Sequence, residues 1–264
     1  MLEHFYVRIA EHRLVLGTES DFVKAFICQK YGASLIESEI LPEADIAVSI
    51  FDGYGGPFVD YNVNVTTADE VIVYKRADYL IEADKEYREA RIHVYDDFAL
   101  KHAMVNLYSA YITRKEWGLL IHSSCLLEHG KAYMFAGHSG AGKSTVVRLS
   151  QPRPILSDEA TIVKIAGDET VIYNSPFRSD TDLPDIAGTY PLTAIQILRQ
   201  SLDIRRLRMG GMEGLQQIFQ RVFYWAHDPE ETKKVFRMCS KLTGHVPVYE
   251  LFFQKNDKFW EEIS

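Results

Sequence analysis

The sequence predicts an α/β protein with a small α+β module over residues 1–95 and a larger α/β domain over residues 96–264. Two observations lead to this prediction. Short runs rich in β-branched and aromatic residues, separated by turn residues, fill the first part. In the second part a strand, a glycine-rich loop and a helix follow one another, which is the local order of an α/β unit.

The first module is expected to contain one helix among five strands. Ser20 or Asp21 can cap the helix and Gly32 can end it, so we predict a helix over residues 20–32. Residues 53–57 (GYGGP) are rich in glycine, but no helix follows them, so we interpret them as a hairpin turn or loop. The expected strands cover residues 5–10, 13–17, 45–52, 70–76 and 90–96.

The larger domain is expected to begin with a helix over residues 96–118, where the apolar spacing becomes helical. We expect this apolar face to lie in the core. Two strands should follow, over residues 118–130 and 131–137, joined at Gly130. The apolar positions of the helix face are Leu100, Met104, Leu107, Tyr108 and Tyr111.

The stretch AGHSGAGKST, from Ala136 to Thr145, contains the pattern G-x-x-x-x-G-K-[ST]. Its glycines allow bends that a β-carbon would obstruct, so that backbone N–H groups can surround a phosphate. Lys143 adds a positive charge, the helix expected after it adds unpaired amides, and Ser144 offers its hydroxyl to Mg²⁺. A chance glycine-rich turn is the alternative. The predicted nucleotide phosphate site comprises Gly137, His138, Ser139, Gly140, Ala141, Gly142, Lys143, Ser144 and Thr145.

Two acidic residues, Asp158 and Glu159, follow shortly after this loop. The prolines in residues 151–154 should end the loop helix, and a strand beginning at Ile155 can then run parallel to the strand before the loop. The acids would lie at its carboxyl end, where open α/β sheets bind ligands. Carboxylates there can hold Mg²⁺ or accept a proton from an attacking hydroxyl. A solvated strand end is the alternative.

Composition excludes several classes of protein. The net charge of −8 argues against a nucleic-acid partner, which would require a basic surface. Cys28, Cys125 and Cys239 form no metal or redox pattern, so we expect buried thiols in a reducing compartment. Because the chain lacks a run of eighteen apolar residues, we expect a cytoplasmic protein without membrane contact. The sequence leaves the oligomeric state open, a homo-oligomer included.

The short spacing between the loop and the acids resembles the catalytic core of the HPr kinase/phosphorylase family. The matching segments are IHSSCLLEHGKAYMFAGHSGAGKS and ILSDEATIV, between Leu119 and about Ile165. The resemblance implies that His122 and Asp158 correspond to the family's histidine and its first, catalytic aspartate, and that Glu159 corresponds to its second aspartate. The second acid is Glu rather than Asp, and the family's later R-G-x-G stretch has no match here.

A histidine on an apolar strand is otherwise a satisfied core residue; the resemblance instead implies that His122 places charge near the phosphates. The turn YNSPFRSD, from Tyr173 to Asp180, resembles shorter HPr-kinase-like proteins, some of which phosphorylate a lasso-peptide precursor at its C-terminal serine. The closing segment VPVYELFFQKNDKFWEEI also resembles that branch. The candidates for a cationic contact with the γ-phosphate or the acceptor, with a solvated face as the alternative, are Arg178, Arg205, Arg206 and Arg208.

These observations predict a kinase that uses ATP and Mg²⁺ to phosphorylate a serine of a peptide or small protein, with a lasso-peptide precursor as the expected acceptor. Lys143 would hold the phosphates and act in catalysis, Ser144 and Glu159 would bind Mg²⁺, and Asp158 would face the acceptor. Two alternatives stay open: a regulatory kinase/phosphorylase that acts on HPr, and a nucleotide-binding switch that has no acceptor.

Overall fold

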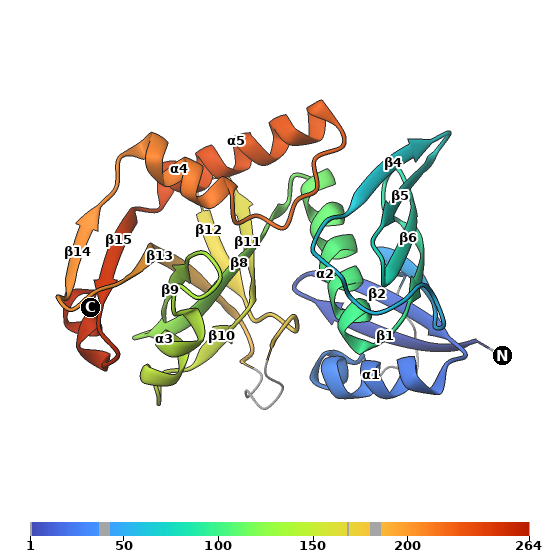
Figure 1. The fold of residues 1–264 in the computed structure, drawn as a ribbon, viewed down its shortest axis with the longest axis horizontal. Helices are drawn as coiled ribbons and strands as arrows, with labels where there is room; N and C mark the ends of the chain where they lie inside the picture. Colours follow the sequence, from blue (N-terminus) through green and yellow to red (C-terminus); the bar gives the residue numbers. More distant parts are fainter. Residues whose placement is uncertain (1, 37–42, 168, 180–185, 264) are drawn as a thin grey trace. The chain divides into compact units, whose positions relative to one another are not determined.

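The computed structural model of the chain describes residues 2–36, 43–167, 169–179 and 186–263. It has a mixed α/β fold with two sheets, as the sequence predicts (Figure 1). The chain forms two compact units, one of residues 1–114 and 224–232, the other of residues 115–223 and 233–264. No helix in the part of the chain that the structure describes is long and apolar enough to cross a membrane.

The first unit contains a seven-stranded sheet with the order β1-β2-β3-β7-β6-β5-β4. Strand β3 pairs in parallel with β2 and β7, and the other pairs are antiparallel. The elements are β1 (Glu3–Ile9), β2 (His12–Thr18), α1 (Asp21–Tyr31), the 3₁₀ helix η1 (Gly32–Ser34), β3 (Ile46–Phe51), β4 (Asn64–Ala68), β5 (Val71–Lys75), β6 (Tyr79–Asp84), β7 (Glu89–Val94) and α2 (Asp97–Arg114).

The five strands and the helix predicted for this module are confirmed, and β4 and β6 are added to them. Ser20 caps α1, since its hydroxyl accepts a hydrogen bond from the Val23 amide at 3.4 Å. Residues 53–57 form a loop, as expected. Gly55 has a φ of +67°, and a β-carbon there would lie 2.2 Å from the carbonyl oxygen of Ala77, so this turn requires glycine.

Helix α2 packs on the sheet of the first unit, against β6 and β7 (Figure 1). Asn106 donates from Nδ2 to the hydroxyl of Tyr79 at 3.1 Å, and the Tyr108 hydroxyl donates to the carbonyl of Ile9 at 3.2 Å. The predicted apolar face is buried, but it is buried against this sheet. The division between the units therefore falls after Arg114, whereas we predicted it at residue 95.

The second unit is built on five strands that pair in a closed ring, β8-β9-β13-β12-β11 and back to β8. Strand β10 joins β8, and β15 and β14 extend the sheet from β13. The elements are β8 (Gly118–Glu128), β9 (Lys131–Ala136), α3 (Lys143–Leu149), β10 (Ile155–Ser157), β11 (Ala160–Ala166), β12 (Glu169–Tyr173), β13 (Thr189–Gln200), β14 (Arg205–Arg208), α4 (Gly211–Phe219), α5 (Pro229–His245), β15 (Val248–Phe253) and the 3₁₀ helix η2 (Asp257–Glu262).

Helix α3 is held in place by a core that includes η2. Val146 and Val147 of α3 pack in one buried cluster with Phe259 and Trp260. The Trp260 indole donates from Nε1 to the Ser150 hydroxyl at 2.9 Å, just after α3 ends. The predicted order of strand, loop and helix over residues 131–149 is thus confirmed, and the helix has little freedom to move relative to its sheet.

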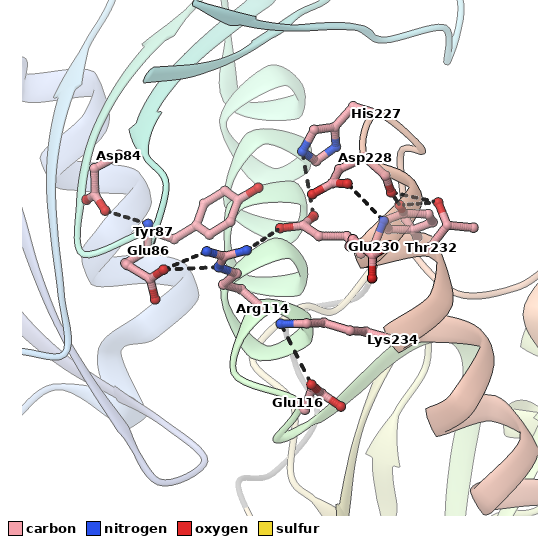
Figure 2. A network of polar contacts seen from close by, with 12 residues as sticks. Asp84, Glu86, Tyr87, Arg114, Glu116, His227, Asp228, Glu230, Thr232 and Lys234 are labelled. Atoms are coloured by element: carbon pink, nitrogen blue, oxygen red, sulfur yellow. Dashed lines mark hydrogen bonds and ion pairs between the residues drawn. The ribbon is translucent and has the colours of Figure 1, made fainter. Parts of the chain in front are cut away.

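Residues 224–232 group with the first unit although they follow α4 in the chain. Figure 2 shows the polar contacts that hold them there. Arg114, at the end of α2, donates from Nη2 to Glu86 at 2.7 Å, and its Nη1 lies 3.8 Å from Glu231. Glu231 is buried and lies 3.6 Å from Nε2 of His227. A separate ion pair, between Glu116 and Lys234 at 3.7 Å, lies within the second unit.

Candidate functional site

The glycine-rich loop lies where three parallel strands end. Strands β9, β13 and β15 are parallel neighbours, so their carboxyl ends lie on one edge of the sheet. The loop leaves β9 after Ala136, and Gln200 at the end of β13 donates from Nε2 to the carbonyl of Gly140 at 2.8 Å. This edge is where ligands of α/β sheets bind.

Three glycines define the path of the loop. Gly140 and Gly142 have φ angles of +79° and +111°, a region that other residues rarely adopt. A β-carbon on Gly142 would lie 2.6 Å from Cζ of Phe253, and one on Gly137 would lie 2.5 Å from the β-carbon of Ala141. The loop therefore requires the glycines of the sequence pattern for its shape.

Lys143 folds back over this loop. Its Nζ donates to the carbonyls of Gly137 at 3.3 Å and His138 at 3.5 Å. Burial and the nearby Arg221 lower the pKa of Lys143, and Glu159 opposes this effect. The Ser144 side chain is exposed at the start of α3. The lysine and the hydroxyl of the pattern thus lie on the accessible side of the loop.

Strand β8 brings the loop and the acids to the same level of the sheet. On one edge of β8, Ser123 pairs with Ala136, the last residue of β9. On the other edge, the Ser123 amide donates to the carbonyl of Glu159 at 3.1 Å. Because neighbouring strands lie about 5 Å apart, the start of the loop and the acidic pair are separated by about 10 Å.

The acidic pair follows β10, which runs in the same direction as β9 because both are antiparallel to β8. The two strands are not neighbours, since β8 lies between them. β10 ends at Ser157, so Asp158 and Glu159 lie in a bend and their side chains do not alternate as strand residues would. The bend gives the two carboxylates different surroundings.

Asp158 is buried and accepts hydrogen bonds from the amide of Ser179 at 3.0 Å and from its hydroxyl at 2.5 Å. Glu159 is half-buried, and its negative charge offsets part of the lowering of the pKa values of Lys143 and His122. Glu159 therefore faces the cationic side of the site, whereas Asp158 faces the turn that contains Ser179.

His122 lies on β8 between these groups. Burial, together with the positive charges of Lys143 and Arg221, lowers its pKa to about 4. Its ring lies beside that of Phe223, with 5.7 Å between the centroids. In the nucleotide-free protein His122 is therefore neutral at pH 7, which differs from the charge that the resemblance implied, because the surrounding cations and the lack of solvent oppose protonation.

Arg221 is a residue of the site that our sequence reasoning missed. Residues 221–223 pair with β8, since the His122 amide donates to the Arg221 carbonyl at 2.7 Å and the Phe223 amide donates to that of Leu120 at 2.9 Å. Nη1 of Arg221 donates to the Gln217 carbonyl at 2.5 Å, and its buried Nε has no hydrogen-bond partner among the residues that the structure describes. Its only sequence signal is a lone arginine in the apolar stretch QIFQRVFYW.

The arginines proposed from the sequence have local contacts. Arg178 is buried and donates to the carbonyl of Ser175 and to Oδ1 of Asn174 within its own turn. Arg206 donates to Gln196 at 3.2 Å and lies over the ring of Tyr249. Arg205 lies over the ring of Phe252, and both it and Arg208 are exposed on β14. Asp180 lies outside the described residues.

A hollow of about 580 Å³ adjoins the loop, and its lining includes Gly142, Thr145, Leu202, Phe253 and Lys255. A second hollow, of about 550 Å³, lies in the first unit on the face of its sheet and contains none of the predicted site residues. The hollow beside the loop is therefore the candidate ligand site, because it alone of these two adjoins the motif.

Among the described residues there is no group of three or more His, Cys, Asp or Glu side chains that could hold a metal ion. A Mg²⁺ ion in a phosphate site does not need such a group, because it is usually held there by one or two protein oxygens, phosphate oxygens and water. The exposed Ser144 hydroxyl and the half-buried Glu159 carboxylate supply oxygen ligands of that kind.

The fold and the site define an α/β protein with a glycine-rich loop between a strand and a helix, at the carboxyl edge of parallel strands. The chain belongs to the family of the SynChlorMet cassette protein ScmC, which matches residues 94–264. No curated protein matches the sequence. The chain is similar to the solved structure of the Hpr(Ser) kinase/phosphatase from Coxiella burnetii, with 8% identity over 51% of this chain and 85% of that chain. The TM-score is 0.28, too low for a comparison of the two sites.

The lowered pKa of His122 predicts a pH dependence of stability. Because the folded protein holds His122 neutral down to a pKa of about 4, while the unfolded chain protonates it near pH 6.5, unfolding takes up a proton in this range. The free energy of unfolding should therefore fall as the pH drops from 6.5 to 4, by at most about 3 kcal/mol. Urea unfolding of the nucleotide-free protein and of His122→Gln at several pH values measures this. Equal pH slopes for the two proteins would contradict the assignment.

Proposed function

We propose that the chain is an ATP-dependent kinase that transfers the γ-phosphoryl group to the serine hydroxyl of a peptide or small protein. One observation carries this proposal: the loop of residues 137–145, with Lys143 folded over it, lies one strand away from an acidic pair. The loop pattern supports binding of a nucleoside triphosphate. Carboxylates so close to it support transfer to a hydroxyl, because a kinase site must both hold the phosphates and orient the acceptor.

The electrostatics of the site support a polyanionic ligand. Burial and the neighbouring Arg221 lower the pKa of Lys143. Burial and the neighbouring Arg199 lower the pKa of Arg221 in the same way. Arg199 is itself paired with Glu250 at 2.7 Å, which leaves Glu159 as the acid that offsets Lys143. A triphosphate would supply the missing negative charge, and the same cations would stabilise the charge of the transferring phosphoryl group.

Each side chain then has a role that its surroundings permit. Ser144 and Glu159 would hold Mg²⁺, which when bound neutralises part of the phosphate charge. Asp158 would orient the acceptor hydroxyl, since its carboxylate already accepts a hydrogen bond from a hydroxyl. Because the transition state of phosphoryl transfer is loose, orientation of the hydroxyl matters more than the strength of Asp158 as a base. His122 would contribute a hydrogen bond; in the nucleotide-free protein burial and the positive charges of Lys143 and Arg221 lower its pKa.

The nucleoside would occupy the hollow beside Gly142 and Thr145, because this space begins where the loop ends. For the acceptor, the resemblance of the loop, the acidic pair and the turn at residues 173–180 to peptide-phosphorylating proteins supports a peptide serine. We propose a precursor peptide of the lasso type, with a C-terminal serine, as the acceptor to test first.

Loss of the loop lysine should weaken nucleotide binding. Lys143→Ala removes a charge-assisted contact worth about 1.5–3 kcal/mol, so ATP binding in the presence of Mg²⁺ should weaken roughly tenfold to a hundredfold. Isothermal titration calorimetry measures this, and circular dichroism checks the fold. Lys241→Ala, an exposed lysine on α5, is the matched control. Unchanged affinity in folded Lys143→Ala would remove the nucleotide assignment.

The two acids should lose different properties. Asp158→Asn should keep ATP binding and lose transfer by about 10²- to 10⁴-fold, the usual contribution of a group that handles the acceptor proton. Glu159→Gln should raise the Mg²⁺ concentration needed for half-maximal transfer. Initial rates measured against Mg²⁺ concentration separate the two effects. An Asp158→Asn defect that added Mg²⁺ repairs would show that the two roles are reversed.

The acceptor can be identified by phosphate labelling. With γ-labelled ATP and Mg²⁺, the protein should label a lasso precursor that ends in serine, and should not label the same peptide with a C-terminal alanine, which lacks the hydroxyl. Labelling of HPr without labelling of such peptides would favour the regulatory alternative. ATP hydrolysis without transfer to either acceptor would favour the nucleotide-binding switch.

A further inference from the structure

The carboxylate proposed to orient the acceptor already holds a serine hydroxyl of this chain. Ser179 donates from its hydroxyl to Oδ2 of Asp158 at 2.5 Å, while its amide donates to Oδ1 at 3.0 Å. The hydrogen bond from the Ser179 amide is by itself sufficient to hold this part of the chain at Asp158. The hydroxyl therefore occupies the second carboxylate oxygen, in the geometry that a general base needs toward the hydroxyl that it orients.

The turn before Ser179 is built to keep this position. Its Ser175 amide donates to the carbonyl of Leu156 in β10 at 2.9 Å, so the turn is attached to the strand that precedes Asp158. Arg178 closes the turn from within, since its Nε donates to the Ser175 carbonyl at 2.9 Å, and Phe177 is buried beneath it. Ser179 itself is exposed, so a bound nucleotide can approach its hydroxyl.

Asp158, which binds Ser179, is followed in the chain by a residue that acts on the phosphate site. This residue is Glu159, whose negative charge acts electrostatically on Lys143 of the loop. The hydroxyl of Ser179 is thus bound to Asp158, whereas Lys143 lies toward Glu159. A phosphoryl group held by Lys143 would therefore lie on the Glu159 side of the acidic pair to which Ser179 is bound.

We infer that Ser179 is an acceptor in cis, and that the protein phosphorylates itself at this residue. The inference rests on the proposed kinase function. In the step, the Ser179 hydroxyl oxygen forms a bond to the γ-phosphorus of ATP, the bond from that phosphorus to the oxygen bridging the β-phosphate breaks, and ADP leaves. The hydroxyl proton passes to Oδ2 of Asp158. External acceptors would need Ser179 to leave Asp158 before their own hydroxyl can bind there.

The test is to incubate the full chain with ATP and Mg²⁺ and to locate phosphate by peptide mass spectrometry. Ser179 should become phosphorylated, with a first-order rate constant that stays the same over a tenfold range of protein concentration, because the reaction is intramolecular. Ser179→Ala should lose the label and Ser179→Thr, which keeps a hydroxyl, should retain it. Asp158→Asn should slow the labelling about 10²- to 10⁴-fold.

Matched variants separate this inference from the proposed function. Ser240→Ala, an exposed serine on α5, should leave the label on Ser179 unchanged, and Lys143→Ala should remove it. A protein that labels an external peptide but never Ser179 would overturn the inference and leave the proposed function standing. Labelling whose rate constant rises with protein concentration would overturn the assignment in cis. A folded protein that neither binds ATP nor labels any acceptor would overturn both.

Discussion

Hydrogen bonding along both edges of β8 fixes the relative positions of the groups in the second unit. One edge of β8 pairs with β9 over residues 123–128. The other edge pairs with β10 at Cys125 and Leu126 and with β11 over residues 118–122. A slip of β9 along β8 by two residues would keep every side chain on its face, yet it would move the loop by about 7 Å relative to the acids. The closed ring of strands opposes such a slip, because β9 would have to shift against β8 and β13 together.

The same arrangement concentrates positive charge in a place with little solvent. Lys143 and Arg221 share the space beside the loop, and burial lowers the pKa values of both. Holding cations without sufficient counter-charge costs free energy, so the nucleotide-free site is less stable than its hydrogen bonds suggest. An anion bound there would recover this free energy, which couples occupancy of the loop to the stability of the second unit.

Several features could be predicted from the sequence because they depend on local patterns. The glycines at residues 137, 140 and 142 indicated the loop, since Gly140 and Gly142 have positive φ angles that few other residues adopt and Gly137 leaves no room for a β-carbon. The apolar spacing of α2 predicted its buried face. It could not predict which sheet covers that face, because helical periodicity carries no information about the partner. Strand β4 was missed because its residues are almost all exposed, whereas β6 alternates between buried and half-buried positions and was within reach of the same reasoning.

The site followed the same rule. Lys143, Asp158 and Glu159 stand in short motifs, but Arg221 reaches the site only through pairing of residues 221–223 with β8, far along the chain. The neutrality of His122 likewise depends on burial and on two cations that folding brings near it. The tie between Asp158 and Ser179 joins residues in different turns, and no periodicity links them.

The first unit is made of two separate segments of the chain, residues 1–114 and 224–232. This division limits how the gene can be recombined during evolution. A gene that encoded only residues 1–114 would leave Arg114 with Glu86 but without Glu231, and would remove the ring of His227 from its place 5.7 Å from that of Tyr74. A gene for the remainder would carry this segment, with its buried Glu231, but not the unit that receives it. Exchange of the first unit between genes would thus have to transfer two separate pieces at once. The family match, which spans residues 94–264, includes both α2 and this segment.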